Sequence, residues 1–194
     1  MKIAITGADG RIGRVLTQHW KDAHEITTIG IEHDLRAPGP WEAQLAGAET
    51  IVHLAAVLAD IHDFNLLKDN LAMVLNVVGA AANGHRIVYA SSMWALHEQI
   101  SIGPRGNYYS ASKLAGEAIV AGWSHTHDRP AVSLRIGKFG GPDELRHEML
   151  RVDETTLLWW FDRAIAHDEP VHATWLTVGR SNDLVQWTET GRGA

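Results

Sequence analysis

Short β-branched runs alternate with helical patterns along the chain. The run from Lys2 to Thr6 ends in a glycine-rich turn, and the apolar residues that follow recur at the spacing of one helix face. The same alternation continues as far as Val178. It predicts strands at residues 2–6, 26–31, 50–54, 86–90, 131–136 and 171–178, and helices at residues 12–20, 42–46, 64–80, 109–123 and 154–167.

This order of elements predicts an α/β fold. Strands that alternate with helices are joined by right-handed crossovers into a mostly parallel sheet with helices on both faces, the Rossmann-like doubly wound arrangement. The interval between the second strand and Thr50 is too short for a further strand and helix, so we expect one trimmed edge. No linker divides the chain, and residues 1–194 are expected to form one domain.

The long helix at residues 64–80 has a predicted apolar face, which consists of Leu67, Leu71, Val74, Leu75 and Val78.

Composition narrows the class of ligand. The 194 residues hold 17 Lys and Arg against 23 Asp and Glu, a net charge of −6, which argues against nucleic acid or an anionic membrane as partner. The absence of cysteine excludes disulfides and a catalytic thiolate, and favours the cytoplasm. No window approaches the roughly 18 apolar residues of a membrane span. Among 12 histidines no His-Glu-x-x-His pattern occurs, so no metal is expected.

The glycine-rich turn has the context of a dinucleotide site. The segment Thr6-Gly7-Ala8-Asp9-Gly10-Arg11-Ile12-Gly13 follows a strand and opens a helix. There Gly7 makes the tight turn, Gly10 lets the backbone approach a pyrophosphate, and Gly13 permits close helix packing. The helix N-terminus offers free N–H groups to the phosphates. The spacing is GxxGxxG rather than GxGxxG, and a glycine-rich turn without a nucleotide is the alternative.

An acidic residue after the second strand is the next expected part of such a site. A carboxylate at this point accepts hydrogen bonds from the hydroxyls of an adenosine ribose. Glu32 and Asp34 lie 25 and 27 residues after Gly7, and either one fits, while a solvated turn is the alternative for each. Because a carboxylate would repel a 2′-phosphate, NAD is favoured over NADP, with Arg11 as the cation that opposes this preference.

Three further residues have the types that acid–base catalysis needs. Tyr109-x-x-x-Lys113 places a phenol and an ammonium on one helix face. A nearby cation stabilises a phenolate and so is expected to lower the pKa of Tyr109. Ser92 ends a strand at the carboxyl edge of the sheet, where it can bond a reacting oxygen. Chance spacing and ordinary turn chemistry are the alternatives.

Taken in order, these motifs resemble the extended short-chain dehydrogenase/reductase family, the NAD-dependent epimerase/dehydratases. The resemblance covers residues 2 to about 140, and the segments around Tyr109 and Arg135 are most similar to the uronate dehydrogenase branch. It rests on the glycine turn, Val52-His53-Leu54-Ala55-Ala56, Tyr89-Ala90-Ser91-Ser92, Tyr109-x-x-x-Lys113 and Leu134-Arg135-Ile136-Gly137.

The resemblance implies a role for each part. Tyr109 is then the catalytic base, Lys113 holds the nicotinamide ribose and tunes Tyr109, and Ser92 positions the substrate oxygen. A homodimer paired through helices 64–80 and 109–123 is also implied. The cofactor-binding residues are then Gly7, Asp9, Gly10, Arg11, Ile12, Gly13, Glu32, Asp34, Leu35, Leu54, Ala55, Ala56 and Ile136, with Asp34 and Leu35 near the adenine.

The chain also departs from this family. Met93-Trp94 and Val57-Leu58 stand where uronate dehydrogenases have polar substrate contacts, and residues 142–194 leave a minimal substrate region, which disfavours a nucleotide sugar. The leading hypothesis is an NAD-dependent oxidoreductase that moves a hydride from a hydroxyl or hemiacetal of a small sugar-like substrate. The alternatives are a non-enzymatic dinucleotide-binding sensor or scaffold, and a sugar epimerase or dehydratase that uses bound NAD.

Overall fold

The computed structural model describes residues 1–81, 84–96, 107–140, 150–177 and 188–189. Its main sheet contains β1 (Lys2–Thr6), β2 (Glu25–Ile29), β3 (Thr50–His53), β4 (Arg86–Ser92), β5 (Ala131–Ile136), β8 (His172–Thr177) and β9 (Thr188–Glu189). The helices are α1 (Arg11–Trp20), α2 (Trp41–Ala46), α3 (Phe64–Ala80), α5 (Tyr108–His127) and α6 (Glu154–Ala166), with a 3-10 turn, η1, at Met93–Leu96. A separate parallel pair joins β6 (Lys138–Phe139) and β7 (Arg151–Val152).

The sheet has the order β2-β1-β3-β4-β5-β8-β9. All its pairs are parallel except β8 with β9. In the described part of the chain β2 lies at one edge, and residues 30–40 lead from it to α2 without a further strand. The doubly wound fold and its trimmed edge are therefore confirmed.

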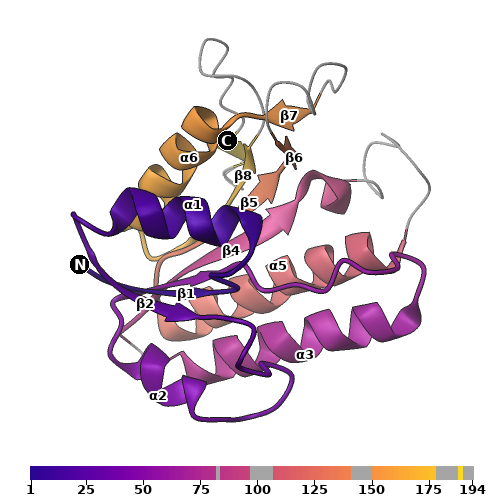
Figure 1. The fold of residues 1–194 in the computed structure, drawn as a ribbon, viewed down its shortest axis with the longest axis horizontal. Helices are drawn as coiled ribbons and strands as arrows, with labels where there is room; N and C mark the ends of the chain where they lie inside the picture. The colour runs from indigo at the N-terminus through magenta and orange to yellow at the C-terminus, as the bar shows by residue number, and fades with distance from the viewer. Residues whose placement is uncertain (82–83, 97–106, 141–149, 178–187, 190–194) are drawn as a thin grey trace.

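Helices cover both faces of the sheet (Figure 1). In this view α1 and α6 lie above the sheet, and α2, α3 and α5 lie below it. Alternate strand residues enter two separate cores: Ile3 and Ile5 pack on the α1 side, and Ala4 packs on the α3 side. Burial on both faces explains why these strands are continuously apolar in sequence.

The apolar face predicted for α3 is only partly correct. Leu75 is 54% exposed, and Leu67 and Leu71 are partly exposed. The buried side of the helix instead consists of Leu66, Asn70, Met73, Val74, Val77 and Val78. An apolar pattern misses this face because one of its central members is the amide Asn70, which is buried with its hydrogen bonds made inside the protein.

Some boundaries also differ from the predicted ones. β2 ends at Ile29 rather than at residue 31, because Gly30 begins a turn in which the His33 N–H donates to the Gly30 carbonyl at 3.2 Å. α5 runs on to His127, and Asp128 ends it in the left-handed conformation. Among the described residues no helix combines the length and the apolar character that crossing a membrane requires.

Candidate cofactor-binding and active site

A cleft of about 810 Å³ opens at the carboxyl ends of β1, β3, β4 and β5. Ligands of doubly wound sheets bind at this edge. Every residue that the sequence suggested for the site lines the cleft except Glu32. Val57 and Leu58, which the sequence placed at substrate-contact positions, also line the cleft. Lining residues that the sequence did not suggest are Gly30, Ile31, His33, Arg36, Met73, Ala90, Ser91, Gly137 and Phe139.

The glycine turn forms the floor of the cleft. Gly7 has φ of 70°, and a Cβ there would lie 2.7 Å from the Ala55 nitrogen. A Cβ at Gly13 would lie 2.5 Å from the Gly7 and Ala8 oxygens. Helix α1 therefore packs so closely against the backbone of the turn that a side chain at Gly13 would clash with it. At Gly10 the nearest atom to a Cβ is the Gly7 oxygen, at 3.1 Å. Gly7 and Gly13 therefore serve the fold, and Gly10 faces space that a ligand can use.

The first turn of α1 suits an anion. No side chain caps the helix, because its N-cap residue is Gly10, and no acidic residue lies in the first turn. The first N–H groups of a helix have no partner within the helix and carry its positive dipole end. The turn therefore fits the pyrophosphate of a dinucleotide.

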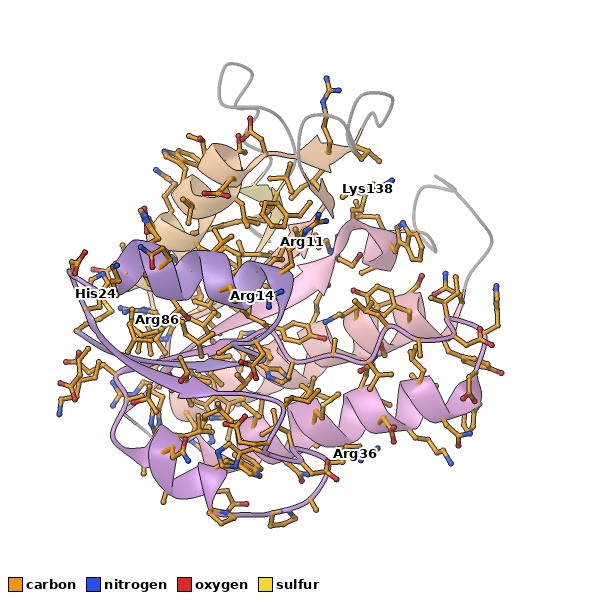
Figure 2. All side chains as sticks on the ribbon, viewed as in Figure 1. Arg11, Arg14, His24, Arg36, Arg86 and Lys138 are labelled. Carbon is orange, nitrogen blue, oxygen red and sulfur yellow. The ribbon has the colours of Figure 1, made fainter. Side chains whose placement is uncertain are left out.

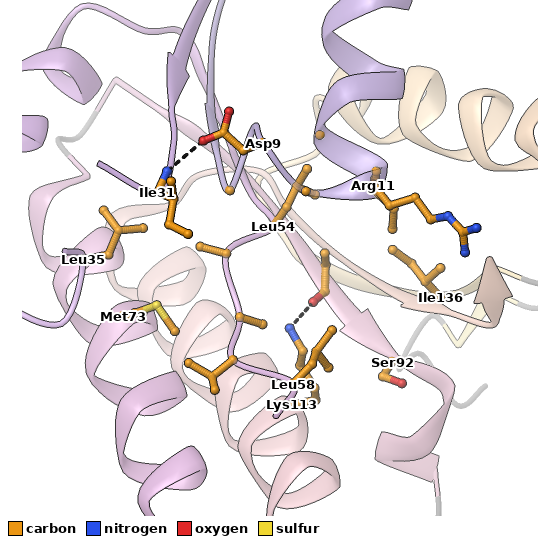
Figure 3. A pocket seen from close by; sticks show the side chains of 18 of the residues that line it. Asp9, Arg11, Ile31, Leu35, Leu54, Leu58, Met73, Ser92, Lys113 and Ile136 are labelled. Carbon is orange, nitrogen blue, oxygen red and sulfur yellow. Dashed lines mark hydrogen bonds between the residues drawn. The ribbon is translucent and has the colours of Figure 1, made fainter. Parts of the chain in front are cut away.

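Asp9 lies at the other side of the turn, where β2 ends. Its Oδ2 accepts a hydrogen bond of 2.8 Å from the Ile31 N–H (Figure 3). Glu32 lies outside the cleft lining, and its Oε1 accepts from the Gly30 N–H at 3.2 Å. Asp34 lines the cleft, but Arg36 bonds both of its carboxylate oxygens.

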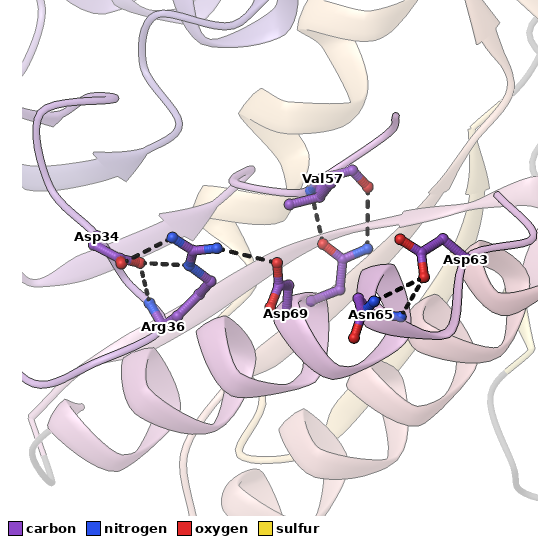
Figure 4. A network of polar contacts seen from close by, with 7 residues as sticks. Asp34, Arg36, Val57, Asp63, Asn65 and Asp69 are labelled. Carbon is purple, nitrogen blue, oxygen red and sulfur yellow. Dashed lines mark hydrogen bonds and ion pairs between the residues drawn. The ribbon is translucent and has the colours of Figure 1, made fainter. Parts of the chain in front are cut away.

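Arg36 bridges the segment after β2 to α3. Its guanidinium donates to Asp34 and also to Asp69, at 3.1 Å (Figure 4). The Arg36 guanidinium keeps the pKa of Asp34 below its ordinary value. Because two carboxylates surround one guanidinium, this end of the cleft carries no excess positive charge.

Arg11 lies away from this end. Figure 2 shows Arg11 beside α1 and Arg36 near α3, on opposite sides of the sheet. The Arg11 guanidinium donates to the Phe139 carbonyl at 3.1 Å, and in Figure 3 Arg11 points toward Ile136 while Asp9 and Ile31 lie on the other side of the cleft. Arg11 is therefore not placed to oppose the charge at the ribose end as the sequence suggested.

Asn70 fixes the wall of the cleft that follows β3. Its side chain accepts from the Val57 N–H at 2.7 Å and donates to the Val57 carbonyl at 3.2 Å (Figure 4). It also donates to the Ser112 hydroxyl on α5. This buried amide therefore holds the loop of residues 54–58 against both α3 and α5.

Ser92, Tyr109 and Lys113 come together at the opposite end of the cleft from Asp9. Ser92 lies close enough to Tyr109 to lower the pKa of its phenol, and the Trp94 ring packs edge-on against the Tyr109 ring with centroids 6.0 Å apart. The Lys113 Nζ donates to the Ala90 carbonyl at 2.8 Å and lies 5.6 Å from the Tyr109 ring centroid. The predicted spacing therefore brings the three side chains to one place.

The acid–base properties of Tyr109 differ from those expected. Burial raises the pKa of Tyr109 to about 12, against the lowering effect of its hydrogen bond with Ser92. Burial lowers the pKa of Lys113 to about 8, and the charge of Glu117 opposes this shift. The expected lowering at Tyr109 is absent because the Lys113 ammonium is directed at the Ala90 carbonyl and burial dominates.

A buried ion pair supports this end of the site from behind. Glu117 on α5 accepts two hydrogen bonds from the Arg135 guanidinium, at 2.9 and 2.8 Å, and a third from the Ser91 hydroxyl. The Glu117 and Arg135 side chains are both 7% exposed. The pair joins α5 to β4 and β5 and so fixes the helix that carries Tyr109 and Lys113.

We expect Glu117→Gln to lower the free energy of unfolding by about 3–5 kcal/mol, because the Arg135 charge would remain buried without its counter-ion. The control is Glu25→Gln, which removes an exposed pair with Lys2 and is expected to change it by about 1 kcal/mol or less. Urea unfolding measures both. Equal stabilities of the two variants would contradict the role given to this pair.

No group of three or more His, Asp or Glu side chains within the described residues is arranged to hold a metal ion.

Comparison with known proteins places this geometry in a family. The NAD dependent epimerase/dehydratase family matches residues 3–175. The chain belongs to this family. Membership confirms the resemblance found in the sequence, the NAD-dependent class of enzyme and the nicotinamide cofactor.

Individual relatives point in the same direction. The L-arabinose 1-dehydrogenase (NAD(P)(+)) of Haloferax volcanii is 29% identical over 181 residues, covering 76% of this chain and 71% of that protein. The uronate dehydrogenase of Agrobacterium fabrum is 26% identical over 161 residues, covering 70% of this chain and 60% of that protein. This chain therefore spans less than three quarters of either relative.

The fold matches solved structures over nearly the whole chain. A Thermus thermophilus UDP-glucose 4-epimerase in complex with NAD superposes with a TM-score of 0.75 at 18% identity, covering 97% of this chain and 79% of that one. At 18% identity, this structural similarity establishes the fold alone. The cleft at the carboxyl edge of the sheet is this chain's own evidence for a cofactor site.

Proposed function

We propose that this chain is a cytoplasmic NAD-dependent oxidoreductase that removes a hydride from a hydroxyl or hemiacetal carbon of a small, sugar-like substrate, with residues 1–194 forming one domain. The observation that carries the proposal is a single cleft with an anion-binding glycine turn at one end and Ser92, Tyr109 and Lys113 at the other. A dinucleotide that spans the cleft would bring its nicotinamide to these three side chains.

The proposed steps use the three side chains in turn. Ser92 bonds the substrate hydroxyl and keeps it beside Tyr109, whose pKa the Ser92 side chain already lowers. The Tyr109 oxygen takes the hydroxyl proton as the general base. Lys113 holds the nicotinamide ribose, and it stabilises the phenolate once its ammonium turns from the Ala90 carbonyl toward Tyr109. A bound nicotinamide would supply the acceptor for the hydride.

The substrate end of the cleft favours a small molecule. The Trp94 ring packs edge to face with the Tyr109 ring, and Phe139 lines the cleft together with Ile136. The names of the two relatives, an arabinose dehydrogenase and a uronate dehydrogenase, suggest free aldoses and uronates as the first substrates to test. Residues 142–149, 178–187 and 190–194 lie outside the described residues, so the minimal substrate region stays a prediction.

NAD is the proposed form of the cofactor. Among the described residues, Asp9 and Asp34 line the adenosine end of the cleft, and Asp34 shares a single arginine, Arg36, with Asp69. This balance disfavours a 2′-phosphate. Tighter binding of NADP than of NAD in calorimetry would overturn the preference.

The deciding experiment is a screen of free aldoses, uronates and small alcohols with NAD, followed by the absorbance of the reduced cofactor. Net formation of NADH with a sugar is the expected result. Interconversion of two sugars without net NADH, with cofactor that copurifies, would favour an epimerase. Tight NAD binding without turnover of any substrate would favour the sensor or scaffold. The intact Ser92, Tyr109 and Lys113 set weighs against that last reading.

The proposed enzyme is a homodimer joined through α3 and α5. Both helices carry apolar side chains that the described chain leaves at the surface: Phe64 is 53% exposed and Tyr108 is 39% exposed, with their rings packed edge to face. Leu75 is exposed on the same helix as Phe64. An isologous pair would bury these side chains in a four-helix interface.

We expect light scattering at micromolar concentration to give the mass of a dimer. Leu75→Lys is expected to shift the mass toward the monomer, because it places a charge in the interface. The matched control is Lys21→Glu, an exposed change that follows α1 on the other face of the sheet. A monomer mass for the unmodified protein would refute the dimer.

A further inference from the structure

The end of β2 lacks a side chain at the position where a ribose-binding acid is expected. Dinucleotide-binding folds place an Asp or Glu there, and its carboxylate bonds the ribose hydroxyls. In this chain β2 ends at Ile29, and the next residue is Gly30. Gly30 has no positive φ that would require glycine, so the backbone itself admits any residue at this position.

The carboxylate of Asp9 occupies the space that a side chain at position 30 would take. A Cβ built on Gly30 would lie 2.1 Å from Asp9 Oδ2 and 2.9 Å from Asp9 Cγ. The Ile31 N–H holds Oδ2 in place at 2.8 Å (Figure 3). The glycine turn therefore supplies a fixed carboxylate at the point where the second strand supplies none.

Neighbouring acids are placed differently. A Cβ at Gly30 would also meet Glu32 Oε2, at 2.5 Å, but the Glu32 side chain is 60% exposed and lies outside the cleft lining. Asp34 lines the cleft, yet both of its oxygens receive bonds from Arg36. Asp9 also lines the cleft. Among the described residues, no hydrogen bond reaches its second carboxylate oxygen, Oδ1.

We propose that Asp9 is the carboxylate that binds the adenosine ribose hydroxyls, and that its charge, rather than that of Glu32 or Asp34, excludes the 2′-phosphate of NADP. The absence of a side chain at Gly30 makes room for it. The specificity-determining acid has thus moved from the second strand to the glycine turn. This inference rests on the proposed NAD-dependent function.

The test compares the dissociation constants of NAD and NADP by calorimetry. Asp9→Asn keeps the size of the side chain and an oxygen that can accept from Ile31, but it removes the charge. Hydrogen bonds to charged groups are stronger than neutral ones, so the affinity for NAD should fall about 10- to 100-fold. The affinity for NADP should stay the same or rise, so the ratio of the two dissociation constants should no longer favour NAD. Glu32→Gln, the matched change on the other carboxylate beside Gly30, should alter the NAD affinity by less than about twofold.

A reciprocal variant tests the relocation itself. Asp9→Gly combined with Gly30→Asp moves the carboxylate back to the end of β2 and opens the space that the new side chain needs, while the exposed Glu32 can swing aside. This double variant should recover most of the NAD affinity that Asp9→Gly alone loses. Both proteins are checked for a native circular dichroism spectrum.

Two outcomes overturn the assignment. One is unchanged NAD affinity in a folded Asp9→Asn protein, and the other is a loss that follows Asp34→Asn or Glu32→Gln instead. A wild-type protein that binds neither nucleotide would overturn the proposed function and this inference together, which distinguishes it from the first two outcomes.

Discussion

Tyr109→Phe should lower turnover by about 10²- to 10⁴-fold, the range for loss of a general acid–base group, while the affinity for NAD remains close to that of the wild type. The ring and its packing against Trp94 stay, and only the oxygen that takes the substrate proton is lost. Steady-state kinetics and calorimetry measure the two quantities separately.

The pH dependence gives the same prediction a second readout. Tyr109 must lose its proton to act as the base, and its pKa is raised to about 12 in the structure. The rate of the wild-type enzyme should therefore rise with pH until Lys113, whose pKa is lowered to about 8, loses the charge that the site requires. The residual activity of Tyr109→Phe should lack this rise.

Two variants control the register of the site. Tyr108 lies one position earlier on α5, outside the cleft lining, with its ring against Phe64, so Tyr108→Phe should have little effect. Lys113→Met should reduce both turnover and NAD affinity, because Lys113 is assigned to the ribose as well as to the phenol. If Tyr108→Phe were the damaging change, the active-site register would be wrong.

Parts of the site that depend on short sequence spacing could be predicted. The glycine turn lies between a strand and a helix, and Tyr109 and Lys113 lie one helical turn apart. Ser92 ends β4, which is a neighbour of β5 in the sheet. In a parallel sheet these positions converge at one edge whatever the details of the packing.

Parts of the site that depend on contacts between distant segments could not be predicted from the sequence. The contact of Asp9 with the end of β2 joins residues 22 positions apart, and nothing in the sequence shows that the carboxylate fills the space over Gly30. No sequence pattern singles out Arg36, because its partner Asp69 comes beside it only in the folded chain. The raised pKa of Tyr109 likewise follows from burial, which no spacing rule contains.

Gly10 and Gly13 of the turn make separable predictions, because the structure leaves different amounts of room at the two positions. Gly10→Val should reduce NAD binding to below detection and leave the protein folded. Gly10 has φ of −69° and ψ of 169°, which any residue adopts, and its Cβ would meet only the Gly7 oxygen, at 3.1 Å. The valine side chain would then stand in the path of the pyrophosphate.

Gly13→Val is the matched contrast three residues further along the same turn. Its Cβ would lie 2.5 Å from two backbone oxygens, so the change should destabilise the fold by about 1–3 kcal/mol or more, as overpacking does. Calorimetry with NAD and thermal unfolding, applied to both variants, separate loss of binding from loss of structure. Unchanged NAD affinity in a folded Gly10→Val protein would contradict a cofactor in this cleft. Equal destabilisation by Gly10→Val and Gly13→Val would show that the turn serves packing alone. The protein itself leaves room for a side chain at Gly10, so only a bound ligand would make a substitution there harmful.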